Sequence, residues 1–142
     1  METRKSVNVY WLVKEYDEVV SSGAIHNTIV DDGLEQLDKL SNGVSSDYFD
    51  DIAIGTDSTA VTTSDSALGT EFDKQLATLT YTSSKAQWYY EFTFPSGTSE
   101  SIEEIGVFNG ASVMMNRALT GGIAVTAATT LQITVTLNST RA

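Results

Sequence analysis

The stretch that decides the fold is residues 102–137, which reads IEEIGVFNGASVMMNRALTGGIAVTAATTLQITVTL. It contains apolar segments separated by the turn signals Asn-Gly and Gly-Gly. Its last segment alternates almost perfectly, with the apolar positions at Leu131, Ile133, Val135 and Leu137. In a strand these four side chains face one side of a sheet, and the Gln and Thr residues between them face the other. This pattern predicts architecture rather than chemistry.

A first strand is predicted near the N-terminus by alternating apolar residues at Val7, Val9, Trp11 and Val13. We expect residues 16–20 to return beside this strand, because residues 14–15 and 21–23 have the composition of turns. The two segments together predict an antiparallel pair.

One amphipathic helix is predicted near residues 31–41, from apolar residues at helical spacing: Val30, Leu34, Leu37 and Leu40. Asp32 and Glu35 have the spacing of a capping box, and Asn42-Gly43 supplies a stop signal. We expect this helix to cap one end or edge of the sheets.

Further strands are expected at residues 48–55, 76–81, 87–94, 102–108, 112–119, 123–125 and 131–137. Turns are expected at residues 83–85 and 95–98, at Asn109-Gly110 and at Gly121-Gly122. The polar segment 56–70 is long for a loop, so we expect it to be mobile or wrapped over a neighbour. Seven to nine strands with one short helix predict a mainly β fold, an antiparallel β-sandwich that is jelly-roll-like or a flattened barrel. We expect a single domain over residues 1–142.

The composition narrows the classes of function. The chain has 142 residues and a formal net charge of −11, from 8 Lys+Arg and 19 Asp+Glu. This charge argues against nucleic acid or an anionic membrane as the main partner. A solvated acidic surface is the simplest interpretation, and salty surroundings or a basic partner are the alternatives. With no Cys there is no disulfide framework or thiol nucleophile. No apolar run approaches the ~18 residues of a membrane span, and we expect folding in a cytoplasm.

His26 is the only histidine, so a Ser-His-Asp triad would have to use it. Ser21, Ser22, Asp31 and Asp32 are the nearest partners in sequence, but the chain has no Gly-x-Ser-x-Gly elbow. We expect His26 to be a structural residue beside the start of the helix, hydrogen-bonded to backbone groups.

Two sets of acidic residues have a chemical interpretation. Asp47, Asp50, Asp51 and Asp57 could supply oxygen ligands for Ca²⁺, but no Asp-x-Asp-x-Asp-Gly loop is present and a solvated rim is simpler. Glu104 could form a glycosidase pair with Glu103 or with Glu91. Neighbours in a strand point to opposite faces, which removes the pair with Glu103, and nothing else supports Glu91.

The aromatic residues Trp11, Trp88, Tyr89 and Tyr90 could stack on sugars, although aromatic residues at strand spacing are more often core. The glycines Gly106, Gly110, Gly121 and Gly122 are expected in turns or bulges. Met114-Met115 is expected in edge or core packing or at a subunit contact. We therefore assign no catalytic, cofactor-binding or metal-binding residue, and expect a protein that is not an enzyme.

Three groups of segments resemble a family. They are HNTIVDDGL at 26–34, IGT at 54–56 with DSALGTE at 65–71, and IGVFN at 105–109 with MNRAL at 115–119. Together with the alternating C-terminal strand, their order resembles small virion proteins of tailed bacteriophages, described as tail-fibre-like, head-fibre or capsid accessory proteins. The resemblance covers roughly residues 25–138 and departs where a proline is expected and residues 59–61 read Thr-Ala-Val.

The resemblance implies a non-enzymatic β-rich structural protein that is assembled in the host cytoplasm and resides on the virion. It implies a homo-oligomer, with a trimer favoured, that binds other virion proteins such as the major capsid or tail protein. Neither nucleic acid nor a membrane is an expected partner. A capsid decoration or cement protein is the first expectation, because so short a chain lacks a shaft or repeat region. The alternative is a tail or tail-fibre component that binds a host receptor or carbohydrate.

Overall fold

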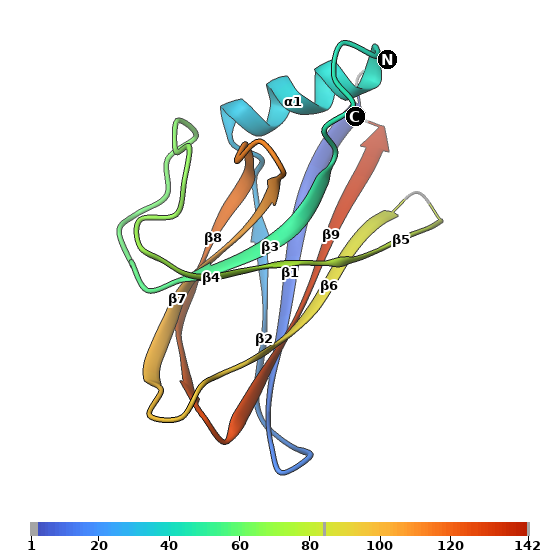
Figure 1. The fold of residues 1–142 in the computed structure, drawn as a ribbon. Coiled ribbons are helices and arrows are strands. Elements are labelled where there is room, and N and C mark those ends of the chain that lie inside the picture. The colour runs from blue at the N-terminus through green and yellow to red at the C-terminus, as the bar shows by residue number, and fades with distance from the viewer. Residues whose placement is uncertain (1–2, 84, 142) are drawn as a thin grey trace.

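Two antiparallel sheets pack face to face in the computed structural model, which describes residues 3–83 and 85–141 (Figure 1). The elements in chain order are β1 (Thr3–Glu15), β2 (Glu18–Asn27), α1 (Asp31–Ser41), β3 (Phe49–Gly55), β4 (Glu71–Leu76), β5 (Thr78–Thr82), β6 (Lys85–Thr93), β7 (Ser99–Asn109), β8 (Met114–Thr126) and β9 (Thr129–Arg141). The first sheet has the order β2-β1-β9-β6-β5 and the second has the order β4-β3-β7-β8. This arrangement confirms the predicted antiparallel β-sandwich with one short helix.

The alternating C-terminal strand lies where its pattern predicts. In β9, the side chains of Leu131, Ile133 and Val135 are completely buried between the sheets. β1 pairs with β9 along its whole length, so the buried Val9 stands opposite Val135. The register places the predicted apolar faces of both strands on the core side.

The first hairpin turns later than the sequence predicts, because β1 continues through the predicted turn at residues 14–15. Its turn is at Tyr16 and Asp17, which have positive φ values of 51° and 64°. β2 then continues through residues 21–23, so the predicted turn at that point is wrong. Gly23 lies there because the ring of Trp11 covers its backbone, and a Cβ at Gly23 would come within 2.6 Å of that ring. The glycine permits a close approach inside a strand.

Gly121 and Gly122 do not form the predicted turn either. They lie within the single strand β8, where both have positive φ values, of 81° and 100°. The register with β7 shifts there, between the pairs Glu104↔Leu119 and Ile102↔Ile123. The two glycines therefore form a bulge that bends β8 without ending it.

The predicted strand at residues 76–81 is two strands in different sheets. β4 ends at Leu76 in the second sheet, and β5 begins at Thr78 in the first. Between them, the backbone N–H of Ala77 donates a hydrogen bond of 2.8 Å to the carbonyl of Asp50. Because the chain switches sheets there, β4 and β5 form the edges on the same side of the sandwich.

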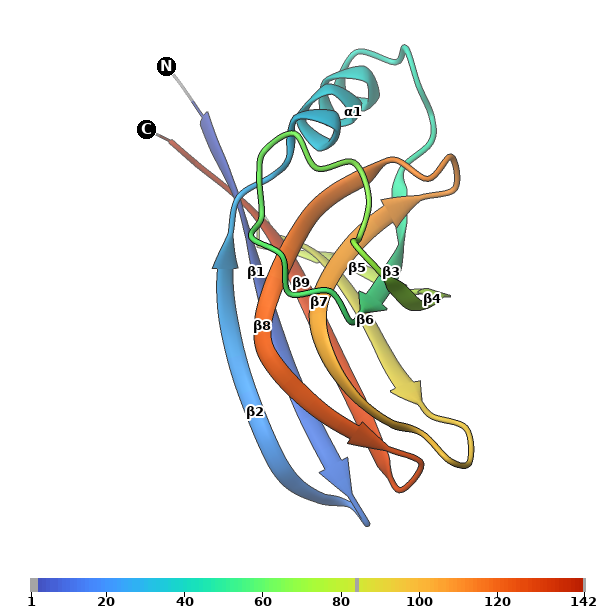
Figure 2. The same ribbon diagram turned by 90° about the vertical axis from the view of Figure 1, so that its left-hand side faces the viewer.

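Helix α1 spans the predicted residues and lies across one end of the sandwich (Figure 2). The predicted capping box is absent, because the N-cap is Val30 and no side chain caps the helix. The N–H of Val30 instead donates to the carbonyl of Met115, at 3.0 Å. The predicted apolar face is also partly wrong: Gly33 is buried against the backbone of Met115, whereas Leu34 is 45% exposed. Tertiary hydrogen bonds thus replace the local cap.

The polar segment 56–70 is wrapped over its own chain. It lies along the outer face of the second sheet, as Figure 2 shows. Leu68 from this segment joins a small second apolar cluster with Val30, Ala53, Phe108 and Met114. The segment therefore covers part of the outer face of the second sheet, whereas the register pair Ser101↔Ala124 farther along β7 and β8 is exposed. Among the described residues, no helix has the length and hydropathy to cross a membrane.

Candidate functional site

The densest polar cluster lies under segment 56–70, on neighbouring strands of the second sheet. Glu104 of β7 is 0% exposed and Arg117 of β8 is 3% exposed. The Nε of Arg117 donates a hydrogen bond of 2.7 Å to Oε1 of Glu104. Such a pair is stable in an apolar interior only if its remaining donors and acceptors also find partners.

The carboxylate of Glu104 accepts three further hydrogen bonds, all from backbone N–H groups of segment 56–70. Gly69 donates at 2.8 Å to Oε1, while Thr70 at 2.9 Å and Asp57 at 3.0 Å donate to Oε2. Burial alone raises the pKa of Glu104. The hydrogen bonds from Arg117 and from these three N–H groups outweigh burial, so the pKa lies below its ordinary value. The carboxyl group is therefore ionised and ties both ends of the segment to β7.

The guanidinium of Arg117 is satisfied by the same segment. Nη1 donates to the carbonyl of Thr59 at 2.9 Å and to Oδ2 of Asp65 at 3.4 Å. Nη2 donates to the carbonyl of Asp57 at 3.2 Å and to its Oδ2 at 3.4 Å. The pKa of Asp65 is lowered, first by the backbone N–H of Thr62 and then by its hydroxyl and the charge of Arg117, against an opposing effect of burial. We call these residues, Asp57, Asp65, Glu104 and Arg117, the buried ion network.

Two glycines make room for the network. A Cβ at Gly55 would lie 2.5 Å from Oε2 of Glu104 and 2.5 Å from the carbonyl of Thr70. A Cβ at Gly69 would collide with the carboxylate of Asp57. The signals Ile-Gly-Thr and Leu-Gly-Thr in the sequence therefore mark the two places where the segment meets Glu104.

The network has the chemistry of a tether rather than of a catalyst. Every nitrogen of the Arg117 guanidinium donates to an oxygen, and both oxygens of Glu104 accept. Sequence reasoning missed this network: it considered Glu104 only as half of a glycosidase pair and did not single out Arg117. A lone Arg followed by apolar residues inside a predicted strand was the one signal that could have indicated a buried partner.

His26 lies in β2, four residues before the helix-capping Val30. Its Nδ1 is 2.8 Å from Oδ1 of Asn8 on β1, across the register pair Asn8↔His26. The expectation of a hydrogen bond to backbone is replaced by this contact between side chains. The nearby Ser22 points from the same strand face but is not hydrogen-bonded to the imidazole in the described part of the chain.

The other acidic candidates are not brought together. Asp57 belongs to the buried ion network, whereas Asp47 lies beside α1 and its carbonyl accepts from Gln36 at 2.8 Å. Over residues 3–83 and 85–141, no three Asp, Glu or His side chains are placed to hold a metal ion. The pKa of Asp51 is raised, mainly by burial and then by the charge of Asp50, with partial compensation from Lys74.

The carboxylates proposed as glycosidase pairs are also apart. Glu91 lies on β6 in the first sheet, whereas Glu104 lies on β7 in the second. Glu103 accepts a hydrogen bond of 2.6 Å from the hydroxyl of Ser101 and takes no part in the network of its neighbour.

The four aromatic candidates do not form one platform. Trp88 is buried, and its Nε1 donates to the carbonyl of Phe49 at 2.7 Å. Trp11 packs on Gly23, and Tyr90 packs edge-on against Phe92 with ring centroids 4.7 Å apart. Tyr89, in contrast, pairs with Thr134 and lies on the outer face of the first sheet, because its neighbour Trp88 faces the core.

The remaining glycine and methionine candidates are structural. Gly106 stands opposite Arg117, and a Cβ there would meet the carbonyl of Asn116 at 2.8 Å. The Asn109-Gly110 signal correctly predicts a hairpin between β7 and β8. Met114 and Met115 are both 0% exposed, so they belong to the core and cannot form a subunit contact.

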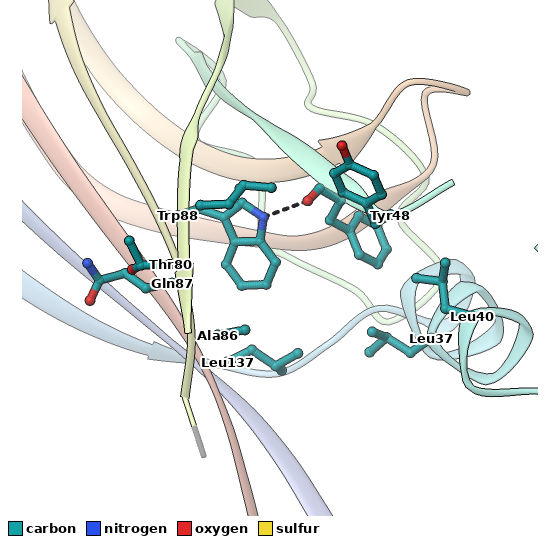
Figure 3. A pocket seen from close by; sticks show the side chains of 10 residues that line it. Leu37, Leu40, Tyr48, Thr80, Ala86, Gln87, Trp88 and Leu137 are labelled. Atoms are coloured by element: carbon teal, nitrogen blue, oxygen red, sulfur yellow. Dashed lines mark hydrogen bonds between the residues drawn. The ribbon is translucent and has the colours of Figure 1, made fainter. Parts of the chain in front are cut away.

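An apolar groove of about 260 Å³ opens between α1 and the hairpin of β5 and β6. Leu37 and Leu40 of α1 lie on one side of it, and Ala86, Trp88 and Leu137 lie on the other (Figure 3). Its lining is completed by Tyr48, Phe49, Leu79, Thr80 and Gln87.

The rim of this groove exposes large apolar side chains. Tyr48 is 59% exposed, Leu79 42%, and the adjacent Tyr81 on β5 72%. β5 is also an edge strand of the first sheet, and all its residues are exposed. Exposed apolar groups beside an open strand edge are typical of protein contact surfaces.

Comparisons of this chain with known protein families, with curated proteins and with solved structures found no match. In the fold, Arg117 lies among three groups of segments: 26–34, 54–56 with 65–71, and 105–109 with 115–119. Segment 26–34 contributes Asn27, whose amide donates to the carbonyl of Arg117 at 3.0 Å. Segments 54–56 and 65–71 flank the loop that the network holds, and segments 105–109 and 115–119 lie in the paired strands β7 and β8. These motifs therefore form one structural unit.

Proposed function

We propose that this chain is a non-enzymatic virion structural protein of a tailed bacteriophage, and specifically a capsid decoration or cement protein. Its proposed partners are other virion proteins, in the first place the major capsid protein, and further copies of itself. The resemblance favours a trimer. The proposed location is the virion, after assembly in the host cytoplasm.

The observation that carries the proposal is the apolar rim at the open side of the sandwich. Tyr48, Leu79 and Tyr81 expose large apolar surface in a chain whose net charge is −11. A monomer that acts alone in water gains nothing from such a rim, whereas a protein that docks on a larger assembly buries it. The unpaired edge of β5 beside the rim adds backbone donors and acceptors for the same contact.

The contacts of the buried charges Glu104 and Arg117 support a structural role. The strongest ion pair, Glu104 with Arg117, holds segment 56–70 on the second sheet and leaves no free donor or base for chemistry. The segments that resemble phage proteins surround this pair. A second sheet with a firmly tethered covering segment suits a protein that must keep its shape on a particle surface.

Analysis of purified virions tests the proposal. We expect the chain to copurify with particles at a constant molar ratio to the major capsid protein, set by capsid symmetry, and to be located on the head by labelling and electron microscopy. Its presence only in infected-cell lysate, never in purified particles, would overturn the proposal. Labelling of the tail would replace decoration with the alternative, a tail component that binds a host receptor or carbohydrate.

A matched pair of variants tests the docking rim. Leu79→Glu places a charge in the groove and is expected to lower occupancy on particles at least tenfold. Tyr16→Glu changes a residue that is 85% exposed at the distant β1–β2 turn and is expected to leave occupancy unchanged. Equal occupancy for both variants would exclude the groove as the docking site.

A further inference from the structure

The outer face of the first sheet differs chemically from the rest of the molecule. Segment 56–70 lies on the second sheet and α1 packs against β8, so neither covers this face among the described residues. Because core-facing and outer side chains alternate along each strand, its residues follow from the register. Tyr10 marks the face with 47% of its surface exposed.

The register arranges these side chains in rows across the strands: four successive rows, and after them a row toward the β1–β2 turn that consists of Lys14, Thr130 and Thr93. The first row consists of Ser6, Asn138, Lys85 and Thr82. The second row consists of His26, Asn8, Thr136, Gln87 and Thr80. The third row consists of Ala24, Tyr10, Thr134, Tyr89 and Thr78. The fourth row consists of Ser22, Leu12, Gln132 and Glu91.

These rows are almost free of charge in a strongly acidic chain. Lys85 and Glu91 are the charged residues of the four rows, and their charges cancel. Lys14 in the next row adds one positive charge, whereas the whole chain carries −11. Hydroxyl, amide and tyrosine side chains make up most of the remainder. Depletion of charged residues with enrichment of Tyr is the compositional mark of protein interfaces.

We propose that a second copy of this chain packs on this face. Two copies with a charge of −11 repel each other, and the repulsion is least where the facing surfaces carry no net negative charge. A two-fold axis that lies between the two sheets and runs across the strands brings the face against itself. Aligned packing of two sheets about 10 Å apart then interdigitates the outer side chains of both copies.

The two charged residues are arranged for such an axis. Lys85 and Glu91 lie on the same strand, three residues on either side of Trp88. An axis level with Trp88 places Lys85 opposite Glu91 of the second copy, and Glu91 opposite Lys85. It also places the second row on the third, so that Thr134 meets Thr136. This self-complementarity is the requirement for a symmetric two-fold contact.

The face has the size of a modest interface. Five strands and four rows cover roughly 24 by 27 Å, about 600 Å² of flat area, and the accessible surface of a corrugated sheet exceeds its flat area. A standard interface buries roughly 800 Å² on each partner, so we expect a dimer that dissociates at micromolar concentrations. This inference rests on the self-association part of the proposed function, and it predicts an even number of copies where the resemblance favours three.

Sedimentation velocity on the purified full chain tests the inference without virions, so its outcome is independent of where the protein resides. The wild type is expected to shift from monomer to dimer over a concentration series. Thr134→Glu places two like charges at the centre of the contact and is expected to weaken dimerisation at least tenfold. Ser96→Glu adds the same charge at an exposed turn and is expected to have no effect. Thermal melts of both variants establish that they are folded.

A charge swap identifies the contact itself. Lys85→Glu faces Glu91 of the second copy with a like charge and is expected to weaken the dimer about tenfold. Adding Glu91→Lys recreates the opposite pair and is expected to restore wild-type association. A monomer at all concentrations, a trimer, or a dimer insensitive to Thr134→Glu and the swap would overturn the inference. Binding of a neutral glycan to this face by a chain that stays monomeric would overturn it as well.

Discussion

The carboxylate of Glu104 and the guanidinium of Arg117, on neighbouring strands of the second sheet, meet at 2.7 Å with 0% and 3% of their side chains exposed. Together they hold a segment of polar residues that has no regular secondary structure of its own. The pair thus converts a loop into a covering layer for the sheet. Its loss should release that layer while the first sheet stays paired.

Glu104→Gln removes the negative charge and leaves Arg117 buried with a weaker partner. We expect a loss of about 3–5 kcal/mol in the free energy of unfolding, the usual cost of breaking a buried ion pair. Urea or guanidinium denaturation measures it. Glu103→Gln, at the adjacent position whose carboxylate accepts from Ser101 outside the network, should change stability by no more than about 0.5 kcal/mol. Similar losses for the two variants would contradict the tethering role.

The pH dependence of stability follows from the lowered pKa values of Glu104 and Asp65. The folded state binds these protons more weakly than the unfolded state, whose ordinary values are 4.5 and 3.8. Their contribution is therefore complete above about pH 5 and is lost as the pH falls through the lowered values. Denaturation curves between pH 7 and pH 3 should show this decline, and Glu104→Gln should flatten it. An equally steep decline in the variant would assign the acid sensitivity to other groups.

The effect of Asp51 on stability should depend on pH in the opposite direction. Its pKa is raised above the ordinary 3.8 by burial and by Asp50, so the folded state binds this proton more tightly and the charged form costs stability at neutral pH. Asp51→Asn is expected to raise the melting temperature at pH 7 and to have little effect near pH 3. The exposed Glu100 gives the control, because Glu100→Gln should leave both melting temperatures unchanged. A lower melting temperature for Asp51→Asn at pH 7 would show that the carboxylate stabilises the fold.

The close approach at Gly55 can be tested with one methyl group. In Gly55→Ala the new Cβ would meet both Glu104 and the carbonyl of Thr70 at 2.5 Å, so the segment must move away. We expect a loss of about 1–3 kcal/mol, typical of overpacking at a rigid site. Gly110→Ala is the matched control, since a Cβ there has nothing within 4 Å. Unfolding measurements that find equal effects would mean that the backbone at Gly55 has room to adjust.

The alternation of apolar residues predicts most of the strands, because a period of two reports directly which side of a strand is buried. Glycines are where the sequence misleads. Gly23 and Gly122 have the appearance of turn residues, but one lies under a Trp ring and the other lies in a bulge. Only the facing strand decides between these roles, and a single segment carries no information about its partner.

The candidate site could not be predicted for a related reason. Glu104 and Arg117 are thirteen residues apart in sequence and meet only because the register pairs Gly106 with Arg117. The donors on segment 56–70 are backbone N–H groups, which every residue except Pro possesses, so no residue type marks them.

Hydrogen exchange at three backbone amides tests the central claim most directly. The N–H groups of Asp57, Gly69 and Thr70 donate to Glu104, so they should exchange slowly in the wild type although their segment lies at the surface. In Glu104→Gln they should exchange at least tenfold faster, while the amide of Val135 in the core of β9 keeps its protection. Fast exchange of the three amides in the wild type, or unchanged exchange in the variant, would contradict the account of Glu104 as the tether of this segment.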